Sequence, residues 1–150
     1  MDCRITREPI DLAGLLTRVR SDADGAVLLF TGVVRDHHEG RAVEGLRYDA
    51  YEEMAAKKLE AICEEVGSAH AVGEIAAVHR VGELAIGEAS VAIAVASPHR
   101  DAAYAASREI IERVKRELPI WKRERYVDGR EEWLSGNVPP TPERPGSPPG

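Results

Sequence analysis

The run Ala26-Val27-Leu28-Leu29-Phe30-Thr31-Gly32-Val33-Val34 decides the fold class of this chain. It is apolar almost throughout, and a short apolar run bounded by turn residues is typical of a strand buried on both faces. The turn Asp22-Ala23-Asp24-Gly25 precedes it, and segment 36–41, which holds Gly40, is predicted to be a polar loop. We therefore expect residues 26–34 to form a buried strand of a sheet.

Helical and extended segments alternate beyond this strand. Apolar residues recur at helical spacing in segments 9–20, 54–66 and 101–118, and Pro119 ends the last of these. Further strands are predicted at 43–51, 75–81, 89–96, 120–127 and 133–134, with segment 82–88 as a link between two of them. The short connections predict one α+β domain over residues 1–135, built on a largely antiparallel sheet with three main helices.

Residues 136–150 differ in composition from the rest of the chain. Prolines occupy positions 139, 140, 142, 145, 148 and 149. A segment with so few backbone donors and apolar side chains is predicted to be a disordered, Pro/Gly-rich tail. A Pro-rich docking ligand is the alternative, although inert tails are commoner.

The net charge of −6 is unevenly distributed along the chain. Segment 113–125 holds six cationic and two acidic residues, a local sum of +4, so the remainder sums to −10. The acidic remainder argues against a protein that coats nucleic acid or an anionic membrane. A basic region on an acidic protein instead favours a small anionic ligand.

Lysine usage directs attention to the same basic segment. The chain has 16 Arg but only four Lys, and two of these, Lys115 and Lys122, flank Pro119-Ile120-Trp121. Arg stays charged, whereas a Lys in a dry pocket can lose its proton and react. Two solvated surface lysines are the simpler interpretation, which fits the adjacent pair Lys57-Lys58 well.

The remaining composition indicates an ordinary cytoplasmic protein without a metal site. Cys3 and Cys63 have no metal-ligand spacing and are expected to be reduced thiols. The adjacent His37 and His38 point apart, which argues against a metal pair. The N-terminus has no apolar signal region, and no apolar run approaches the roughly 18 residues that span a bilayer.

Several polar groups lie at predicted strand ends, where a scaffold can direct them into one pocket. Arg35 follows the buried strand, and either a solvated side chain or a phosphate or carboxylate contact is consistent with that position. His79-Arg80 ends another strand, where a structural role is favoured. Ser97-Pro98-His99-Arg100 leads into a helix whose N-terminus suits an anion, and a capped helix with exposed His and Arg is equally consistent.

The sequence closely resembles a known protein family over residues 4–134. The resemblance is carried by Phe30-Thr31-Gly32-Val33-Val34-Arg35, Leu46-Arg47-Tyr48-Asp49-Ala50-Tyr51, His79-Arg80-Val81-Gly82, Ser97-Pro98-His99-Arg100 and Pro119-Ile120-Trp121-Lys122-Arg123-Glu124. Five motifs in register are specific, and they resemble the MoaE family of large, catalytic molybdopterin synthase subunits.

The resemblance implies an α/β-hammerhead fold and an enzyme that makes molybdopterin from cyclic pyranopterin monophosphate by adding two sulfurs. It implies that a small ubiquitin-like subunit delivers each sulfur as a thiocarboxylate on its C-terminal Gly-Gly tail. It also implies a heterotetramer around a central homodimer, and no metal or other cofactor, because molybdenum enters later in another protein.

The resemblance also implies roles for individual residues. Lys115 and Lys122 match the catalytic lysines, and Lys122 also matches a substrate contact. The positions that bind the anionic substrate and the partner's terminus correspond to Arg35, His99 and Arg100. Phe30 matches an apolar pocket position. Val33 departs from the pattern, because some relatives carry Lys there. We hypothesise that Lys115 acts as acid, base or transient nucleophile, and that Lys122 helps to hold the ligand.

Two rival functions remain open at this stage. A non-catalytic module that binds a phosphorylated metabolite would use Arg35, His99 and Arg100 but leave the lysines idle. An RNA-binding domain would use Trp121 with Arg123 and Arg125. The acidic remainder and an aromatic content of 5% weigh against RNA.

Overall fold

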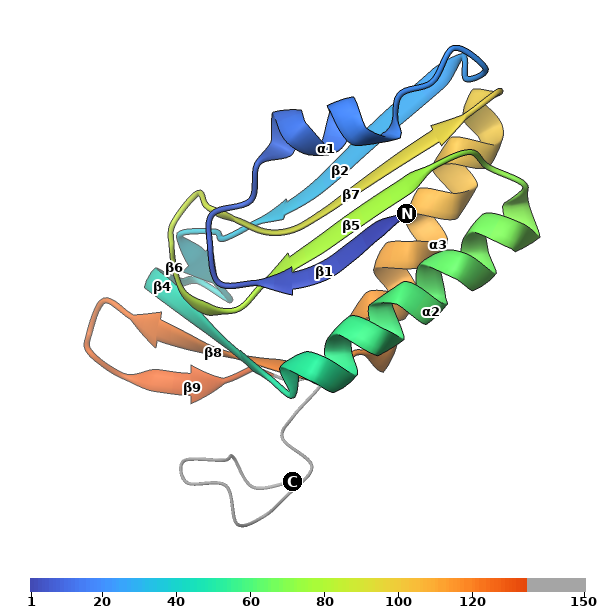
Figure 1. Ribbon diagram of the computed structural model, residues 1–150. Helices are drawn as coiled ribbons and strands as arrows, with labels where there is room; N and C mark the ends of the chain where they lie inside the picture. Colours follow the sequence, from blue (N-terminus) through green and yellow to red (C-terminus); the bar gives the residue numbers. More distant parts are fainter. Residues whose placement is uncertain (135–150) are drawn as a thin grey trace.

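A computed structural model describes residues 1–134 of the protein. Its elements are β1 (Asp2–Thr6), α1 (Leu12–Val19), β2 (Ala26–Val33), β3 (His37–His38), β4 (Arg41–Ala50), α2 (Glu52–His70), β5 (Ile75–Arg80), β6 (Gly82–Ala85), β7 (Ala89–Ser97), α3 (Arg100–Glu117), β8 (Ile120–Tyr126) and β9 (Glu131–Trp133). One sheet has the order β1-β5-β7-β2, with α1 on one face and α2 and α3 on the other (Figure 1). Among the described strands only β1 and β5 pair in parallel. The predicted α+β class with three main helices is confirmed.

Strand β7 shows why both faces of this sheet are covered. Its side chains alternate between the two faces, as in any strand. The bulky residues at 91, 93 and 95 belong to the core under α2 and α3. The alanines at 92, 94 and 96 belong to a second core beneath Leu15 and Val19 of α1. Small side chains on that face leave room for α1 to pack closely.

The helices begin and end where local chemistry requires it. The Asp11 carboxylate accepts a hydrogen bond of 3.1 Å from the Gly14 N–H and caps α1. Helix α2 ends at His70, and the next residue, Ala71, adopts the left-handed conformation with φ of 53°. Helix α3 ends at Glu117, and the next residue, Leu118, has the extended ψ of 137° that a following proline imposes. Pro119 therefore turns the chain directly from α3 into β8.

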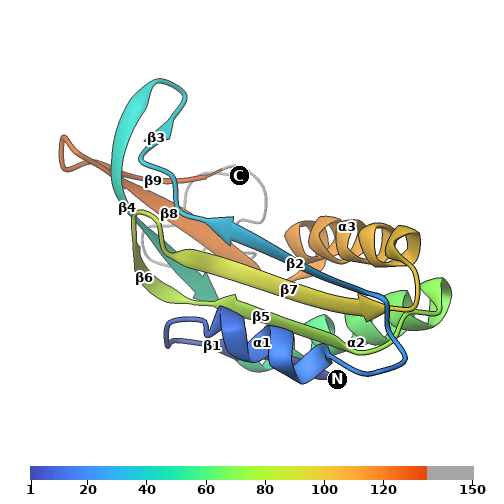
Figure 2. The ribbon, with the colours of Figure 1, turned by 90° about the horizontal axis from the view of Figure 1, so that it is seen from above.

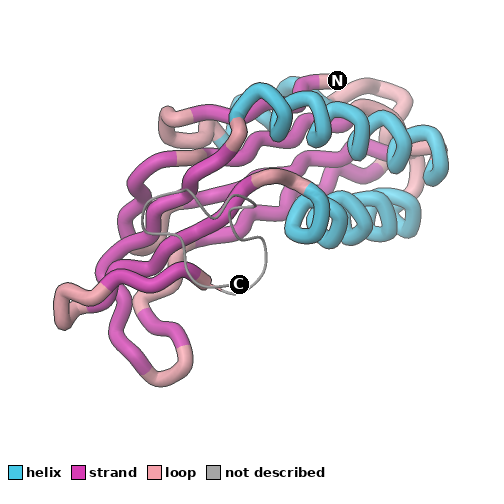
Figure 3. Tube along the Cα trace, turned by 90° about the horizontal axis from the view of Figure 1, so that it is seen from below, coloured by secondary structure: helices cyan, strands magenta, loops and turns pink. Residues whose placement is uncertain are grey.

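The second sheet has the order β3-β4-β8-β9, and β6 also pairs with β4. It extends away from the helices, so strands alone form one end of the molecule (Figure 2 and Figure 3). Strand β4 is long enough to pair with β3 at its beginning and with β6 and β8 along the rest. The last turn of α3 thus lies where the helical layer meets the second sheet.

Three short strands were not predicted from the sequence. Strand β1 lies in the lead before α1, β3 lies in the predicted loop 36–41, and β6 lies in the predicted link 82–88. These strands have two to five residues, too few for a periodic apolar pattern, and they form because a partner strand lies beside them. The predicted tail 136–150, and with it the domain boundary at 135, lies outside the described residues. Within residues 1–134, no helix is long and apolar enough to cross a bilayer.

Candidate active site

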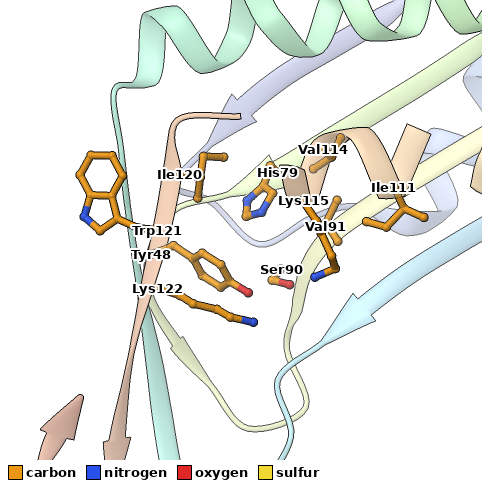
Figure 4. A pocket seen from close by; sticks show the side chains of 10 residues that line it. All are labelled: Tyr48, His79, Ser90, Val91, Ile111, Val114, Lys115, Ile120, Trp121 and Lys122. Carbon is orange, nitrogen blue, oxygen red and sulfur yellow. The ribbon is translucent and has the colours of Figure 1, made fainter. Parts of the chain in front are cut away.

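A cavity of about 220 Å³ lies at the junction of α3 with the second sheet. Helix α3 and strands β4, β5, β7 and β8 contribute to its wall (Figure 4). The lining residues are Tyr48, His79, Ser90, Val91, Ile111, Val114, Lys115, Ile120, Trp121 and Lys122. Both lysines that the sequence analysis singled out therefore contribute to one cavity.

The turn at Pro119 brings the two lysines together. Lys115 lies in the last turn of α3, and Lys122 lies near the start of β8, so each reaches the cavity from a different element. Figure 4 shows the two side chains directing their amino groups toward the same space. Trp121 lies on the opposite face of β8 from Lys122, with its ring edge-on to Tyr51 at 5.3 Å. It is only 2% exposed, which contradicts the idea of an open stacking surface for RNA bases.

Cross-strand pairing fixes the polar side chains opposite α3. Tyr48 of β4 pairs with Lys122 of β8, and Leu46 pairs with Glu124. Positions two apart along a strand share a face, so Lys122 and Glu124 both point the same way. Ser90 reaches this space from β7, where a bulge lies opposite Gly32. The Ser90 hydroxyl donates a hydrogen bond of 3.3 Å to the Gly32 carbonyl oxygen.

A second hollow of about 270 Å³ joins the first and adds Arg35 to the site. The two hollows share Tyr48, Ser90, Lys115 and Lys122. The second is further lined by Gly32, Val33, Arg35, His38, Leu46, Glu124 and Leu134. The structure therefore brings Arg35 together with both lysines. A bound anion would meet three cationic side chains, which come from α3, from β8 and from the segment after β2.

The electrostatics of the joined hollows are dominated by these cations. Burial lowers the pKa of Lys122, and the positive charges of Lys115 and Arg35 lower it further, while the Glu124 carboxylate acts in the opposite direction. An anionic ligand would reverse the repulsive contribution by neutralising the neighbouring charges. The site is thus suited to bind an anion.

Glu124 is a buried carboxylate in this site that the sequence analysis did not assign. It is 4% exposed, and its Oε1 accepts the Tyr126 hydroxyl at 2.9 Å. Burial, followed by the hydrogen bond to Glu124, raises the pKa of Tyr126 to about 12, so the hydroxyl keeps its proton and remains a donor. The sequence gives no signal for Glu124, because an acidic residue beside Lys122, Arg123 and Arg125 looks like a solvated surface group.

His79 forms part of the cavity wall between β4 and α3. It is 7% exposed, and its ring lies edge-on to Tyr48 with 5.0 Å between ring centroids. Its Nδ1 lies 2.9 Å from the Arg80 carbonyl oxygen. Burial lowers the pKa of His79 to about 4, and the charges of Lys115 and Lys122 contribute. Arg80, its neighbour, instead pairs with Glu88 at 2.9 Å in a structural contact.

This histidine is expected to make the protein less stable in mild acid. As pH falls below 6.5 the unfolded chain protonates at this position, whereas the folded protein does not until pH about 4. The folded state is therefore most stable above pH 6.5, and the loss reaches about 3 kcal/mol near pH 4. Urea unfolding between pH 7 and pH 4.5 should show a steeper decline for the wild type than for His79→Gln. Parallel declines would contradict the assignment of a buried, neutral ring.

His99 and Arg100 lie at the other end of α3 from Lys115. They line a separate hollow of about 420 Å³, together with Gly25, Ala26, Pro98 and Asp101. Arg100 and Lys115 are the first and sixteenth residues of a continuous helix. At a rise of 1.5 Å per residue this places their backbones about 22 Å apart. One chain therefore does not bring His99 and Arg100 to the lysines.

Phe30 lies outside the two hollows that hold the lysines. It packs against the core under α2 and α3. Its predicted pocket role is not apparent within one chain.

Residues 1–134 contain no group of three His, Cys, Asp or Glu side chains placed to hold a metal ion.

Comparisons with known proteins show which proteins this chain is similar to. The family model described as "MoaE protein" matches residues 5–117. The molybdopterin synthase catalytic subunit of Bacillus subtilis is 41% identical over 137 residues, covering 91% of this chain and 87% of the relative. That of Culex quinquefasciatus is 41% identical over 133 residues, covering 87% and 85%. The crystal structure of molybdopterin synthase from Staphylococcus aureus has a TM-score of 0.83 and 41% identity, covering 88% of this chain and 96% of that chain.

Proposed function

Because this chain belongs to the MoaE protein family, with molybdopterin synthase catalytic subunits among its relatives, we propose that it transfers sulfur to cyclic pyranopterin monophosphate. The observation that carries the proposal is the joined pair of hollows in which Arg35, Lys115 and Lys122 converge. A phosphate needs cationic partners, and a flat ring needs a cavity with apolar walls. This site offers both.

The two parts of the site suit the two parts of this substrate. The hollow that holds Arg35 has the more polar wall and would take the cyclic phosphate, with Lys122 between phosphate and ring. The hollow under α3 is walled by Val91, Ile111 and Val114 and would take the pterin. Sulfur addition would then occur near Lys115, which borders both hollows.

Sulfur would arrive as a thiocarboxylate on the C-terminal glycine of a small ubiquitin-like carrier. The thiocarboxylate sulfur forms a bond to an electrophilic carbon of the pterin, and the oxygen displaced from that carbon takes up a proton. Water then hydrolyses the resulting thioester, which leaves the sulfur on the pterin and a carboxylate on the carrier. A second carrier molecule repeats the sequence at the neighbouring carbon.

Lys115 is placed to supply the proton that the displaced oxygen requires. Its ammonium group lies at the border of the two hollows, on the rigid last turn of α3. Lys122 and Arg35 would stabilise the negative charge of phosphate and carrier terminus. No metal ion or other cofactor takes part in this scheme.

A second copy of the chain would complete the site. His99 and Arg100 lie about 22 Å from Lys115 along α3, so they can reach the ligand only if another protomer supplies them. A twofold dimer makes two equivalent sites, each with lysines from one protomer and His99-Arg100 from its partner. One carrier at each end would give the heterotetramer.

We place the reaction in the cytoplasm, where Cys3 and Cys63 stay reduced.

The proposed function is tested by a single-turnover reaction of the purified chain with cyclic pyranopterin monophosphate and thiocarboxylated carrier. We expect a dithiolene product that contains two sulfurs and requires two carrier equivalents. A module that merely binds a phosphorylated metabolite would retain the pterin but form no product. The proposal would be wrong if product formed without the chain. It would also be wrong if no product formed with the chain although the pterin was bound.

A further inference from the structure

The most informative group that the proposed chemistry does not use is the Nε2 atom of His79. The imidazole is 93% removed from solvent, yet it lines the cavity beside both lysines. Its Nδ1 contacts the Arg80 carbonyl, whereas Nε2 has no hydrogen-bond partner among residues 1–134. Since His79 lines the cavity, this nitrogen is free to form a hydrogen bond with a ligand or with water there.

The geometry around Nδ1 determines what Nε2 can do. A carbonyl oxygen only accepts hydrogen bonds, so the contact of 2.9 Å to Arg80 requires the proton on Nδ1. In the neutral ring Nε2 then carries a lone pair and acts as an acceptor. Burial in a wall shared with two cationic side chains keeps the ring neutral. His79 is therefore a fixed acceptor in a site whose other functional groups are mainly donors.

We propose that Nε2 of His79 accepts a hydrogen bond from a ring N–H of the pterin and thereby selects and orients the ring in the cavity. This inference rests on the proposed function and adds a residue to it. The cations of the site recognise only the negative charge of a ligand, which many phosphorylated metabolites share. An acceptor on the wall distinguishes a ring that carries N–H donors from one of similar shape that lacks them.

The surroundings of His79 support a role in binding rather than in packing alone. Its ring is held on one side by Tyr48 and at Nδ1 by the backbone, so the side chain is fixed before any ligand arrives (Figure 4). A fixed acceptor loses little conformational entropy on binding. An apolar side chain would fill the same space without leaving a nitrogen unpaired.

Two isosteric substitutions separate the nitrogens of His79. The side-chain amide of His79→Asn can replace Nδ1 and keep the contact to the Arg80 carbonyl, but it leaves nothing at Nε2. The longer His79→Gln places an amide oxygen near Nε2 and so restores the acceptor. His79→Phe keeps a ring against Tyr48 and removes both nitrogens, which covers the case in which His79→Asn does not fold.

Equilibrium dialysis with cyclic pyranopterin monophosphate, in the absence of carrier, measures the effect on each folded variant. We expect His79→Asn and His79→Phe to bind about tenfold to hundredfold more weakly than the wild type, and His79→Gln to bind within about threefold of it. Equal binding by all three variants and the wild type would overturn the role of Nε2. Failure of the wild type itself to bind would instead overturn the proposed substrate, so the two failures are distinguishable.

Discussion

Replacing Lys115 with alanine is expected to lower the single-turnover rate of sulfur transfer by about 10²–10⁴-fold, the usual contribution of a positioned proton donor. The loss should fall on the chemical step, because Arg35 and Lys122 remain to hold the substrate. Pterin binding should therefore weaken by no more than about tenfold, the share of one charged contact. Rapid-quench measurement of the dithiolene product, with dialysis for binding, separates the two quantities.

The variant Lys115→Arg tests whether Lys115 contributes a proton to the reaction or only its positive charge. Arg keeps a positive charge but does not release a proton under ordinary conditions. We expect it to bind the pterin and still fail to turn over. Lys57→Arg is the matched control, because Lys57 is a solvated lysine on α2, with 79% of its side chain exposed. Near-normal turnover by Lys115→Arg would mean that Lys115 provides charge alone, and that the proton comes from Lys122 or water.

Two impaired variants are expected to restore activity when they share a dimer. Lys115→Ala removes the amine from one end of α3, and Arg100→Ala removes the guanidinium from the other. In a dimer that contains one copy of each, one site carries both substitutions and the other carries neither. Such a dimer should show about half of the wild-type activity, although we expect Arg100→Ala alone to lose roughly tenfold to hundredfold.

Co-expression with two affinity tags isolates the mixed dimer for this measurement. Arg108→Ala paired with Lys115→Ala is the matched control, because Arg108 is an exposed arginine of the same helix, with 83% of its side chain exposed. That pair retains one intact site and should also reach about half activity, which calibrates the assay. A mixed dimer of Lys115→Ala and Arg100→Ala that stays inactive would show that both residues serve the same protomer's site. A fully active Arg100→Ala protein would remove Arg100 from the site altogether.

The outcome for individual residues shows which features a sequence makes visible. Lys115 and Lys122 could be singled out because they are rare in a chain rich in arginine. Arg35 could be noticed because it ends an apolar strand. Glu124 and His79 gave no comparable signal, since a Glu in a charged segment and a His at a strand end are usually structural. Only their burial, at 4% and 7% exposure, marks them as unusual.

The sequence by itself determined the main helices and strands, the α+β class and the family. These depend on local periodicity, on proline and glycine positions and on residue type, all of which act over a few neighbouring residues. Tertiary structure alone decided which polar groups meet. The turn at Pro119 and the pairing of β4 with β8 join Lys115, Lys122 and Tyr48, while the length of α3 separates Arg100 from Lys115. Distance in space follows from how rigid elements pack, and spacing along the chain does not encode it.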